Sequence, residues 1–152
     1  MAELNEREKK LVVKIVYYGP ALSGKTTNLM QLHEILNPAR CGEFMVFETK
    51  GDRTLFFDLL PMLIKSESGF KIKIKLFTVP GQPAHDATRK EVLNLWQPTG
   101  LPITFSSALS GSGVKETFGI ALKRTYLRLN AVYQLDEKYS VTEEDFLKLI
   151  ES

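Results

Sequence analysis

The sequence predicts a single α/β domain in which helices cover both faces of a mostly parallel β-sheet, giving a three-layer sandwich. Two observations support this fold class. Strand-like apolar runs alternate with stretches of helical periodicity, and a strand, a glycine-bearing turn and a helix follow one another near the N-terminus. The chain has 152 residues, 43% of them hydrophobic, which is enough for one compact core, and no composition break divides it.

The N-terminal half contains the clearest elements. A nearly continuous apolar, β-branched run at 11–18 is typical of a central strand buried on both faces. A helix is expected over 26–36, where apolar residues recur at helical spacing until Asn37-Pro38. Further strands are predicted at 44–48 and 72–77, and the second alternates Ile and Leu with Lys, which indicates one buried and one wet face.

The C-terminal half is predicted to be mostly helical. A helix over 84–96 should stop at Pro98-Thr99-Gly100, a short last strand should follow at 101–105, and an apolar stripe predicts a helix over 114–129. The sequence Ser140-Val-Thr-Glu is interpreted as a capping box before a short amphipathic helix, which we expect to dock on its own domain. We therefore divide the chain into a domain at 1–131 and a helical extension at 132–152.

Bulk composition restricts the possible functions. The formal charge is only +2 and the basic residues are spread along the chain, so nucleic acid is not an expected partner. No apolar run approaches the roughly 20 residues of a membrane span, and the first ten residues lack the apolar stretch of a signal peptide. Cys41 is the single cysteine, which suits a reducing compartment. A cytoplasmic protein without membrane insertion is the expectation.

The strongest functional signal is Gly-Pro-Ala-Leu-Ser-Gly-Lys-Thr at 19–26, which fits the phosphate-loop pattern G-x-x-x-x-G-K-[ST] between a strand and a helix. This setting predicts a P-loop NTPase fold, because backbone N–H groups at a helix N-terminus can surround phosphate oxygens. Lys25 would neutralise the β- and γ-phosphates, and the Thr26 hydroxyl would ligate Mg²⁺. The other predicted phosphate-binding positions are Gly19, Ala21, Leu22, Ser23, Gly24 and Thr27.

Three stretches resemble the MglA branch of small Ras-like bacterial GTPases: the segment 14–28 that contains the phosphate loop, Asp-Arg-Thr-Leu-Phe-Phe-Asp at 52–58, and Thr-Val-Pro-Gly-Gln at 78–82. Over about residues 10 to 93 the resemblance implies a fold of Ras-like type with GTP or GDP and Mg²⁺ as ligands. It also implies a roadblock-type activating partner and effectors of cell polarity or motility.

The resemblance assigns roles to individual residues. Thr54 would sense the γ-phosphate and ligate Mg²⁺, Gly81 would donate its N–H to the γ-phosphate, and Gln82 would orient the attacking water. Arg53 could act as an arginine finger supplied by the chain itself, although a solvated charge is the alternative. The loop Ser107-Ala108-Leu109 is similar to the loop that touches guanine in that family.

The sequence also departs from the family. Ala21 stands where glycine is usual, so hydrolysis is expected to be slow. Pro83 biases Gln82 toward an extended backbone, which could either fix or misplace its side chain. Two βα units of about 30 residues each, with the [NT]-K-x-D motif that reads guanine, have no counterpart between Gln82 and Ser107. The literal match Thr-Lys-Gly-Asp at 49–52 lies in the wrong place and is interpreted as a decoy. We therefore expect a sheet of only about 4–5 strands, in a domain that is internally shortened near residues 94–100.

Three functions remain open from the sequence. The first is a GTP-hydrolysing switch, and the second is a nucleotide- or phosphate-binding module with little hydrolysis and weak guanine selectivity. Ala21 and the missing base motif favour the second. The third, a P-loop kinase or ATPase, would need a second-substrate site, and the sequence offers no candidate residues for one. The chain could also be a natural or cloning deletion of an active parent protein.

Overall fold

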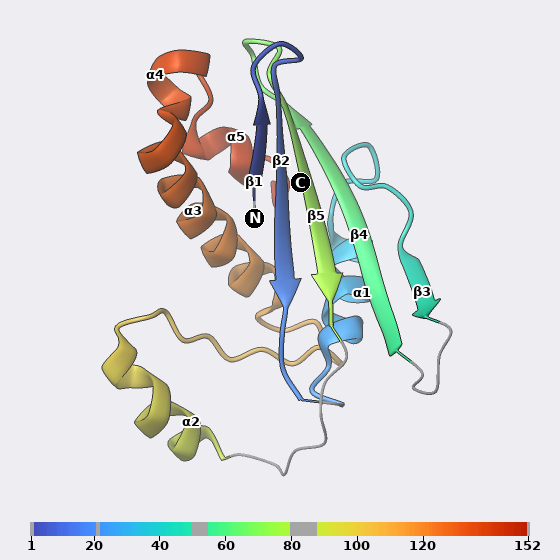
Figure 1. Cartoon of the computed structure of the whole chain (residues 1–152). Coiled ribbons are helices and arrows are strands. Elements are labelled where there is room, and N and C mark those ends of the chain that lie inside the picture. The colour runs from blue at the N-terminus through green and yellow to red at the C-terminus, as the bar shows by residue number, and fades with distance from the viewer. Residues whose placement is uncertain (1, 21, 50–54, 80–87, 152) are drawn as a thin grey trace.

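A computed structural model of the chain describes residues 2–20, 22–49, 55–79 and 88–151. These residues form a five-stranded sheet in the order β1-β2-β5-β4-β3 (Figure 1). The strands are β1 (Ala2–Asn5), β2 (Lys10–Tyr17), β3 (Met45–Thr49), β4 (Leu55–Lys65) and β5 (Lys71–Thr78). The α/β class and the shortened sheet are thus confirmed.

The sheet is mixed, whereas a mostly parallel sheet was predicted. Only the β2–β5 pair is parallel, and the pairs β1–β2, β4–β5 and β3–β4 are antiparallel. The short connections explain this difference, because a strand that follows directly through a tight turn must return antiparallel. Between β4 and β5 the turn is closed by the Gly69 N–H, which donates to the Ser66 carbonyl at 3.0 Å.

The helices that cover the sheet in the described chain lie on one of its faces. The described chain has five α-helices. They are α1 (Lys25–Ile35), α2 (Arg89–Trp96), α3 (Val114–Tyr133), α4 (Leu135–Tyr139) and α5 (Glu143–Leu147), with a 3-10 turn η1 (Gln97–Thr99) after α2. Helix α1 contacts β4 and β5, α5 contacts β4, and α3 packs on α1 and α5, so these three helices share one side (Figure 1). The predicted third layer is absent from the described residues, because α2 lies beyond the carboxyl ends of β2 and β5.

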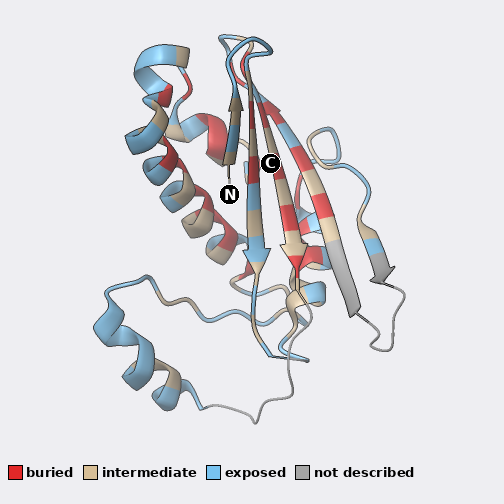
Figure 2. Cartoon of the chain, in the orientation of Figure 1, coloured by how far each residue is buried: buried red, intermediate tan, exposed pale blue. Residues whose placement is uncertain are grey.

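The core lies between that face and the helices. Alternate residues of the three central strands are buried, and Figure 2 shows them as red bands on the strands. From the sheet the core takes Leu11, Val13, Leu60, Met62, Ile64, Ile72, Ile74 and Leu76, and from the helices it takes Leu29, Leu32, Phe118, Leu122 and Phe146. Each large side chain buried in this way stabilises the fold by roughly 1.5–3 kcal/mol relative to exposure, so the core dominates stability.

Several element predictions were wrong in detail. Residues 101–105 form no strand, because β1, which the sequence did not reveal, pairs with the β2 edge from Lys10 to Val13. Strand β4 was also missed, since Pro61 in its middle argues against a strand. The second helix begins at Arg89, where a capping box of Thr88 and Glu91 fixes its start.

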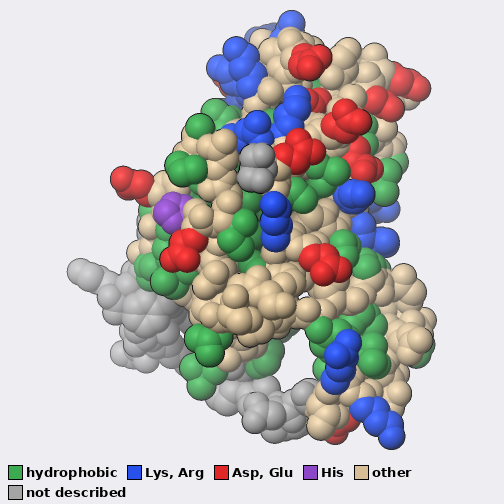
Figure 3. Space-filling model, turned by 180° about the vertical axis from the view of Figure 1, so that it is seen from behind, with side chains coloured by type: hydrophobic (Ala, Val, Ile, Leu, Met, Phe, Trp, Pro, Cys, Tyr) green, Lys and Arg blue, Asp and Glu red, His purple; other side chains and the backbone are tan. Residues whose placement is uncertain are grey.

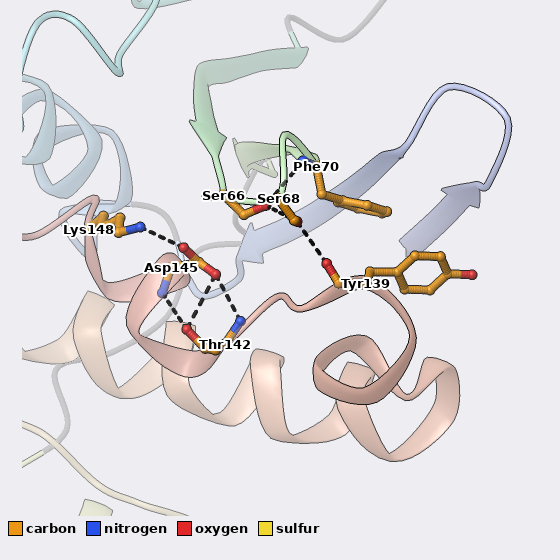
Figure 4. Close-up of polar contacts among 7 residues, drawn as sticks. All are labelled: Ser66, Ser68, Phe70, Tyr139, Thr142, Asp145 and Lys148. Atoms are coloured by element: carbon orange, nitrogen blue, oxygen red, sulfur yellow. Dashed lines mark hydrogen bonds and ion pairs between the residues drawn. The ribbon is translucent and has the colours of Figure 1, made fainter.

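The C-terminal segment docks on its own domain, as predicted. Ser68 in the β4–β5 turn donates its hydroxyl to the Tyr139 carbonyl at 2.8 Å, and the Phe70 and Tyr139 rings lie 5.0 Å apart (Figure 4). Phe146 of α5 is fully buried against the Tyr126 ring, at 5.5 Å between centroids. No described helix is long and apolar enough to cross a membrane.

The capping box of α5 uses Thr142 and Asp145, which corrects the prediction of Ser140. Thr142 donates its N–H to one carboxylate oxygen of Asp145 at 2.9 Å, and Lys148 donates to the other at 2.6 Å (Figure 4). Burial would raise the pKa of Asp145, but the hydrogen bonds from Lys148 and Thr142 outweigh it and hold this pKa below its usual value. The ionised carboxylate therefore stabilises the folded state.

We expect Asp145→Asn to lower the free energy of unfolding at pH 7 by about 1–2 kcal/mol, because it removes a charge-assisted cap. The native pKa is lowered, so this stabilisation is complete above the usual value of 3.8 and is lost as the pH falls through the lowered pKa. Urea unfolding at pH 7 and below pH 3 measures the effect. Glu144→Gln, an exposed change on the same helix, is the control and should stay within about 0.5 kcal/mol. A loss for Asp145→Asn as large below pH 3 as at pH 7 would contradict the assignment.

Candidate nucleotide-binding site

The candidate site begins where β2 passes into α1. The central strand ends at Tyr17 and the helix begins at Lys25, so residues 18–24 connect the two. Gly24 caps the helix in the left-handed conformation, with φ 82° and ψ 16°, and Leu22 is also left-handed, with φ 59°. Left-handed residues inside such a turn direct successive N–H groups toward a common side, which is the geometry of an anion-binding nest.

Lys25 folds back over this loop. Its ammonium group donates to the Gly19 carbonyl at 3.1 Å and to the Pro20 carbonyl at 2.6 Å. An ammonium has three N–H donors, so one remains for an anion while the two carbonyls fix its position. The loop thus holds a positive charge at the N-terminal end of α1, where the helix dipole also favours an anion.

Gly24 is the point where the loop approaches residue 108 closely. A Cβ atom added there would lie 3.2 Å from the Ala108 Cβ, and the positive φ disfavours any other residue. The Asn28 side chain donates to the Gly24 carbonyl at 2.9 Å and so secures the helix cap. The sequence analysis assigned no role to Asn28. The signal for this role is its position four residues after Gly24, one helical turn into α1.

The contact between Gly24 and Ala108 joins the two parts of the predicted site. The loop at 107–109 is closed by the Ser107 N–H, which donates to the Ser112 carbonyl at 2.8 Å. Within it Leu109 is 90% exposed, whereas Ala108 is half-buried against the phosphate loop. The structure therefore brings the predicted guanine-contacting loop to the predicted phosphate loop.

The start of α3 holds this second loop in place. The Thr104 and Thr117 hydroxyls lie 2.8 Å apart, and Thr117 also donates to the Gly113 carbonyl at 2.8 Å. A Cβ atom at Gly113 would lie 2.7 Å from the Phe105 carbonyl oxygen, so only glycine permits this close approach. Residues 104–113 are thereby fixed to the helix.

The end of β5 reaches the same edge of the sheet. Thr78 lies opposite Tyr17 in the parallel β2–β5 pair and is 3% exposed. Burial raises the pKa of Tyr17 to about 12, so its hydroxyl is neutral at physiological pH. The segment that begins at Thr78 and the phosphate loop therefore leave the sheet side by side.

The structure describes only some of the remaining predicted site residues. Ser23 and Thr26 are exposed and Thr27 is half-buried at the start of α1. Ala21, Arg53, Thr54, Gly81 and Gln82 lie outside the described residues, so their predicted roles stay predictions. Among the described residues no group of three or more His, Cys, Asp or Glu side chains could hold a metal. The predicted Mg²⁺ ligand in that part of the chain is the Thr26 hydroxyl.

The loop fits the phosphate group that the motif implies. Its two left-handed residues and the Lys25 ammonium, at the N-terminus of α1, supply the backbone geometry and the charge that a polyphosphate needs. A parallel strand, buried on one face, that leads through such a loop into a helix defines a P-loop nucleotide-binding α/β fold, here in a shortened form.

The chain is similar to the Mutual gliding-motility protein MglA of Myxococcus xanthus (strain DK1622), with 44% identity over 93 residues. These residues are 61% of this chain and 48% of that protein, so the chain spans about half the length of this curated relative. The similarity confirms the resemblance to MglA-like small GTPases, and the partial coverage agrees with a shortened domain. No family model matches the chain.

Alanine replacement at Gly24 and at Gly69, two glycines with nearly the same φ angle, tests the phosphate loop. Their φ angles are +82° and +81°, so replacement by alanine carries the same backbone penalty of about 1–2 kcal/mol. Nothing lies within 4 Å of a Cβ at Gly69, whereas a Cβ at Gly24 meets Ala108 at 3.2 Å. We expect both variants to be less stable, but only Gly24→Ala to bind GTP more weakly, by at least about tenfold in calorimetry.

Ala108→Gly provides the matching rescue. Combined with Gly24→Ala it removes the methyl group that the new Cβ meets, so part of the lost GTP affinity should return. Equal GTP affinities for Gly24→Ala and Gly69→Ala would show that the loop does not bind phosphate through this geometry.

Proposed function

We propose that the chain is a guanine-nucleotide-binding switch that hydrolyses GTP to GDP with Mg²⁺. The observation that supports this proposal best is the loop between β2 and α1, where Lys25 lies over the Gly19 and Pro20 carbonyls and Gly24 adopts a left-handed conformation. The similarity to MglA and the contact between Gly24 and Ala108 favour a guanine nucleotide over other polyphosphates.

In this proposal the phosphate loop binds and orients the triphosphate. Lys25 donates its remaining N–H to a phosphate oxygen and neutralises the β- and γ-phosphates by its charge, and the N–H groups around Gly24 surround the phosphate oxygens. The Thr26 hydroxyl, in the first turn of α1, would ligate Mg²⁺. When bound there, Mg²⁺ would supply neutralisation of the charge that develops on the phosphate oxygens during transfer.

Hydrolysis is assigned to residues outside the described part of the chain. Gln82 orients the attacking water, Arg53 stabilises the transferring phosphoryl group, and Thr54 and Gly81 respond to the γ-phosphate. These assignments rest on the motifs at 52–58 and 78–82 and on the resemblance to MglA-like proteins. The same resemblance supports a roadblock-type activating partner, effectors of polarity or motility, and a cytoplasmic location.

The second candidate is a binding module that holds the phosphates but selects guanine weakly. One observation favours it: residues 101–105 form no strand, so the loop at 107–109 is held by α3 and α1 and not by a strand end as in a full Ras-like sheet. The side chain of Leu109, at 90% exposed, gives a guanine ring no enclosed contact in this arrangement.

Calorimetry with GDP, GTP, ADP and ATP separates the two candidates. The switch proposal expects GDP to bind at least about tenfold more tightly than ADP, a difference of 1.4 kcal/mol. Equal binding of GDP and ADP would support the second candidate, a module that does not distinguish guanine from adenine. Lys25→Ala should lose nucleotide in either case, since it removes the cation of the loop.

Phosphate release from GTP tests the enzymatic part. Gln82→Leu and Arg53→Ala should each lower the turnover rate by about a hundredfold or more while the GTP affinity stays nearly unchanged. Gln97→Leu and Arg128→Ala replace the same residue types at exposed positions and should leave the rate unchanged. A folded, GTP-loaded sample that releases no phosphate would exclude hydrolysis by the chain alone.

A further inference from the structure

The face of the sheet opposite the core has no helix over it in the described part of the chain. Helices α1, α3 and α5 all lie on the other side, and α2 lies beyond the strand ends (Figure 1). In an α/β fold a strand pair such as β2–β5 is ordinarily covered on both faces. We call the uncovered side of β2, β4 and β5 the open face.

The open face is strongly basic. Register and burial place six lysines on it: Lys10, Lys14, Lys65, Lys71, Lys73 and Lys75. Lys10 lies beside Lys71 and Lys14 beside Lys75 in the parallel pair, and Lys65 lies beside Lys71 in the next. Within the described part of the chain none of the six forms a salt bridge.

Positive charge is therefore concentrated on the open face. Six lysines and Glu3, the acidic residue that β1 adds opposite Val12, give the open face a formal charge of +5. The whole chain carries +2, so all other residues together carry −3. The helix-covered side shows acidic and basic side chains intermixed (Figure 3).

Apolar side chains lie between the lysines. Val16 is 52% exposed and Leu63 is 49% exposed, and Val12 and Pro61 are half-buried. A hollow of about 620 Å³ on this face is lined by Lys10, Lys71, Lys73, Pro61 and Leu63, with Arg40 and Glu8 among the other lining residues. The lining of the hollow thus combines cationic and apolar side chains.

The spacing of the lysines matches an α-helix. Lys71, Lys73 and Lys75 follow one another along β5 at steps of about 6.7 Å, since alternate residues of a strand share a face. Carboxylates four residues apart on a helix are separated by about 6 Å along its axis. A helix laid along β5 could pair such carboxylates with the three lysines while apolar residues that flank the carboxylates cover Val12 and Leu63.

We propose that the open face is the docking site for an acidic amphipathic helix of a partner protein. Charge complementarity supplies orientation and rapid association, and burial of the apolar side chains supplies affinity. A second copy of this chain is a poorer occupant, because two faces of +5 repel each other. Nucleic acid is also disfavoured, because a phosphate backbone gains nothing from the exposed Val16 and Leu63.

The test uses the full chain and a synthetic peptide of about 18 residues with glutamate at every fourth position and leucine at the positions that flank the glutamates on the same side of the helix. Fluorescence anisotropy at physiological ionic strength measures its binding. We expect micromolar binding that weakens at higher salt, and a loss of at least about tenfold in Lys73→Glu/Lys75→Glu. The double variant Lys115→Glu/Lys138→Glu changes the net charge equally on α3 and α4 and should bind normally.

Separate measurements exclude the alternatives. Thermal unfolding and GTP binding should be the same in both double variants, which distinguishes loss of docking from misfolding and from failure of the phosphate loop. A glutamate peptide in which serine replaces every leucine should bind at least about tenfold more weakly. The proposal is overturned if the Lys73/Lys75 variant binds the leucine peptide normally, if duplex DNA binds more tightly than that peptide, or if sedimentation shows a dimer that this variant abolishes.

Discussion

The parallel pairing of β2 with β5 is the constraint on which the rest of the structure depends. The register runs from Lys10 opposite Lys71 to Tyr17 opposite Thr78, so both strands end at the same edge of the sheet. From that edge β2 continues into the phosphate loop and α1, and β5 continues from Thr78 into the segment with the predicted hydrolytic residues. A one-residue slip would turn the alternating apolar and lysine side chains to the wrong faces.

The same constraint leaves the two faces of the sheet unequally covered by helices. The neighbours of the parallel pair are β1 on one side and β4 on the other, and both enter antiparallel through tight turns. Hairpins need no crossover helix, so they contribute strands without contributing a layer. Helices α1, α3 and α5 are sufficient to bury the alternating Ile and Leu side chains on one face, and the lysines of β5 keep the opposite face hydrated.

The sequence predicted what is encoded locally. The phosphate loop, α1, α3 and the alternating face of β5 were found because each combines a strong periodicity with a recognisable end. Strand β4 was missed because Pro61 breaks its signal, and a strand at 101–105 was wrong because strand formation depends on a free neighbouring edge. Pairing is a tertiary property, so neither the order of the strands nor the loss of one helical layer could be predicted from periodicity.

The position of the loop at 107–109 shows why part of a nucleotide site can persist in a shortened sheet. In this chain the loop is held by contacts to helices: Thr104 to Thr117 at the start of α3, and Gly111, where a Cβ would lie 3.0 Å from the Gln31 side-chain oxygen of α1. Both helices belong to the layer that covers the core side of the sheet. The contact of Ala108 with Gly24 therefore depends on the packing of α1 against α3 and not on the number of strands beyond β2. Loss of the second helical layer consequently uncovers the lysine-bearing face while the phosphate loop keeps its supports.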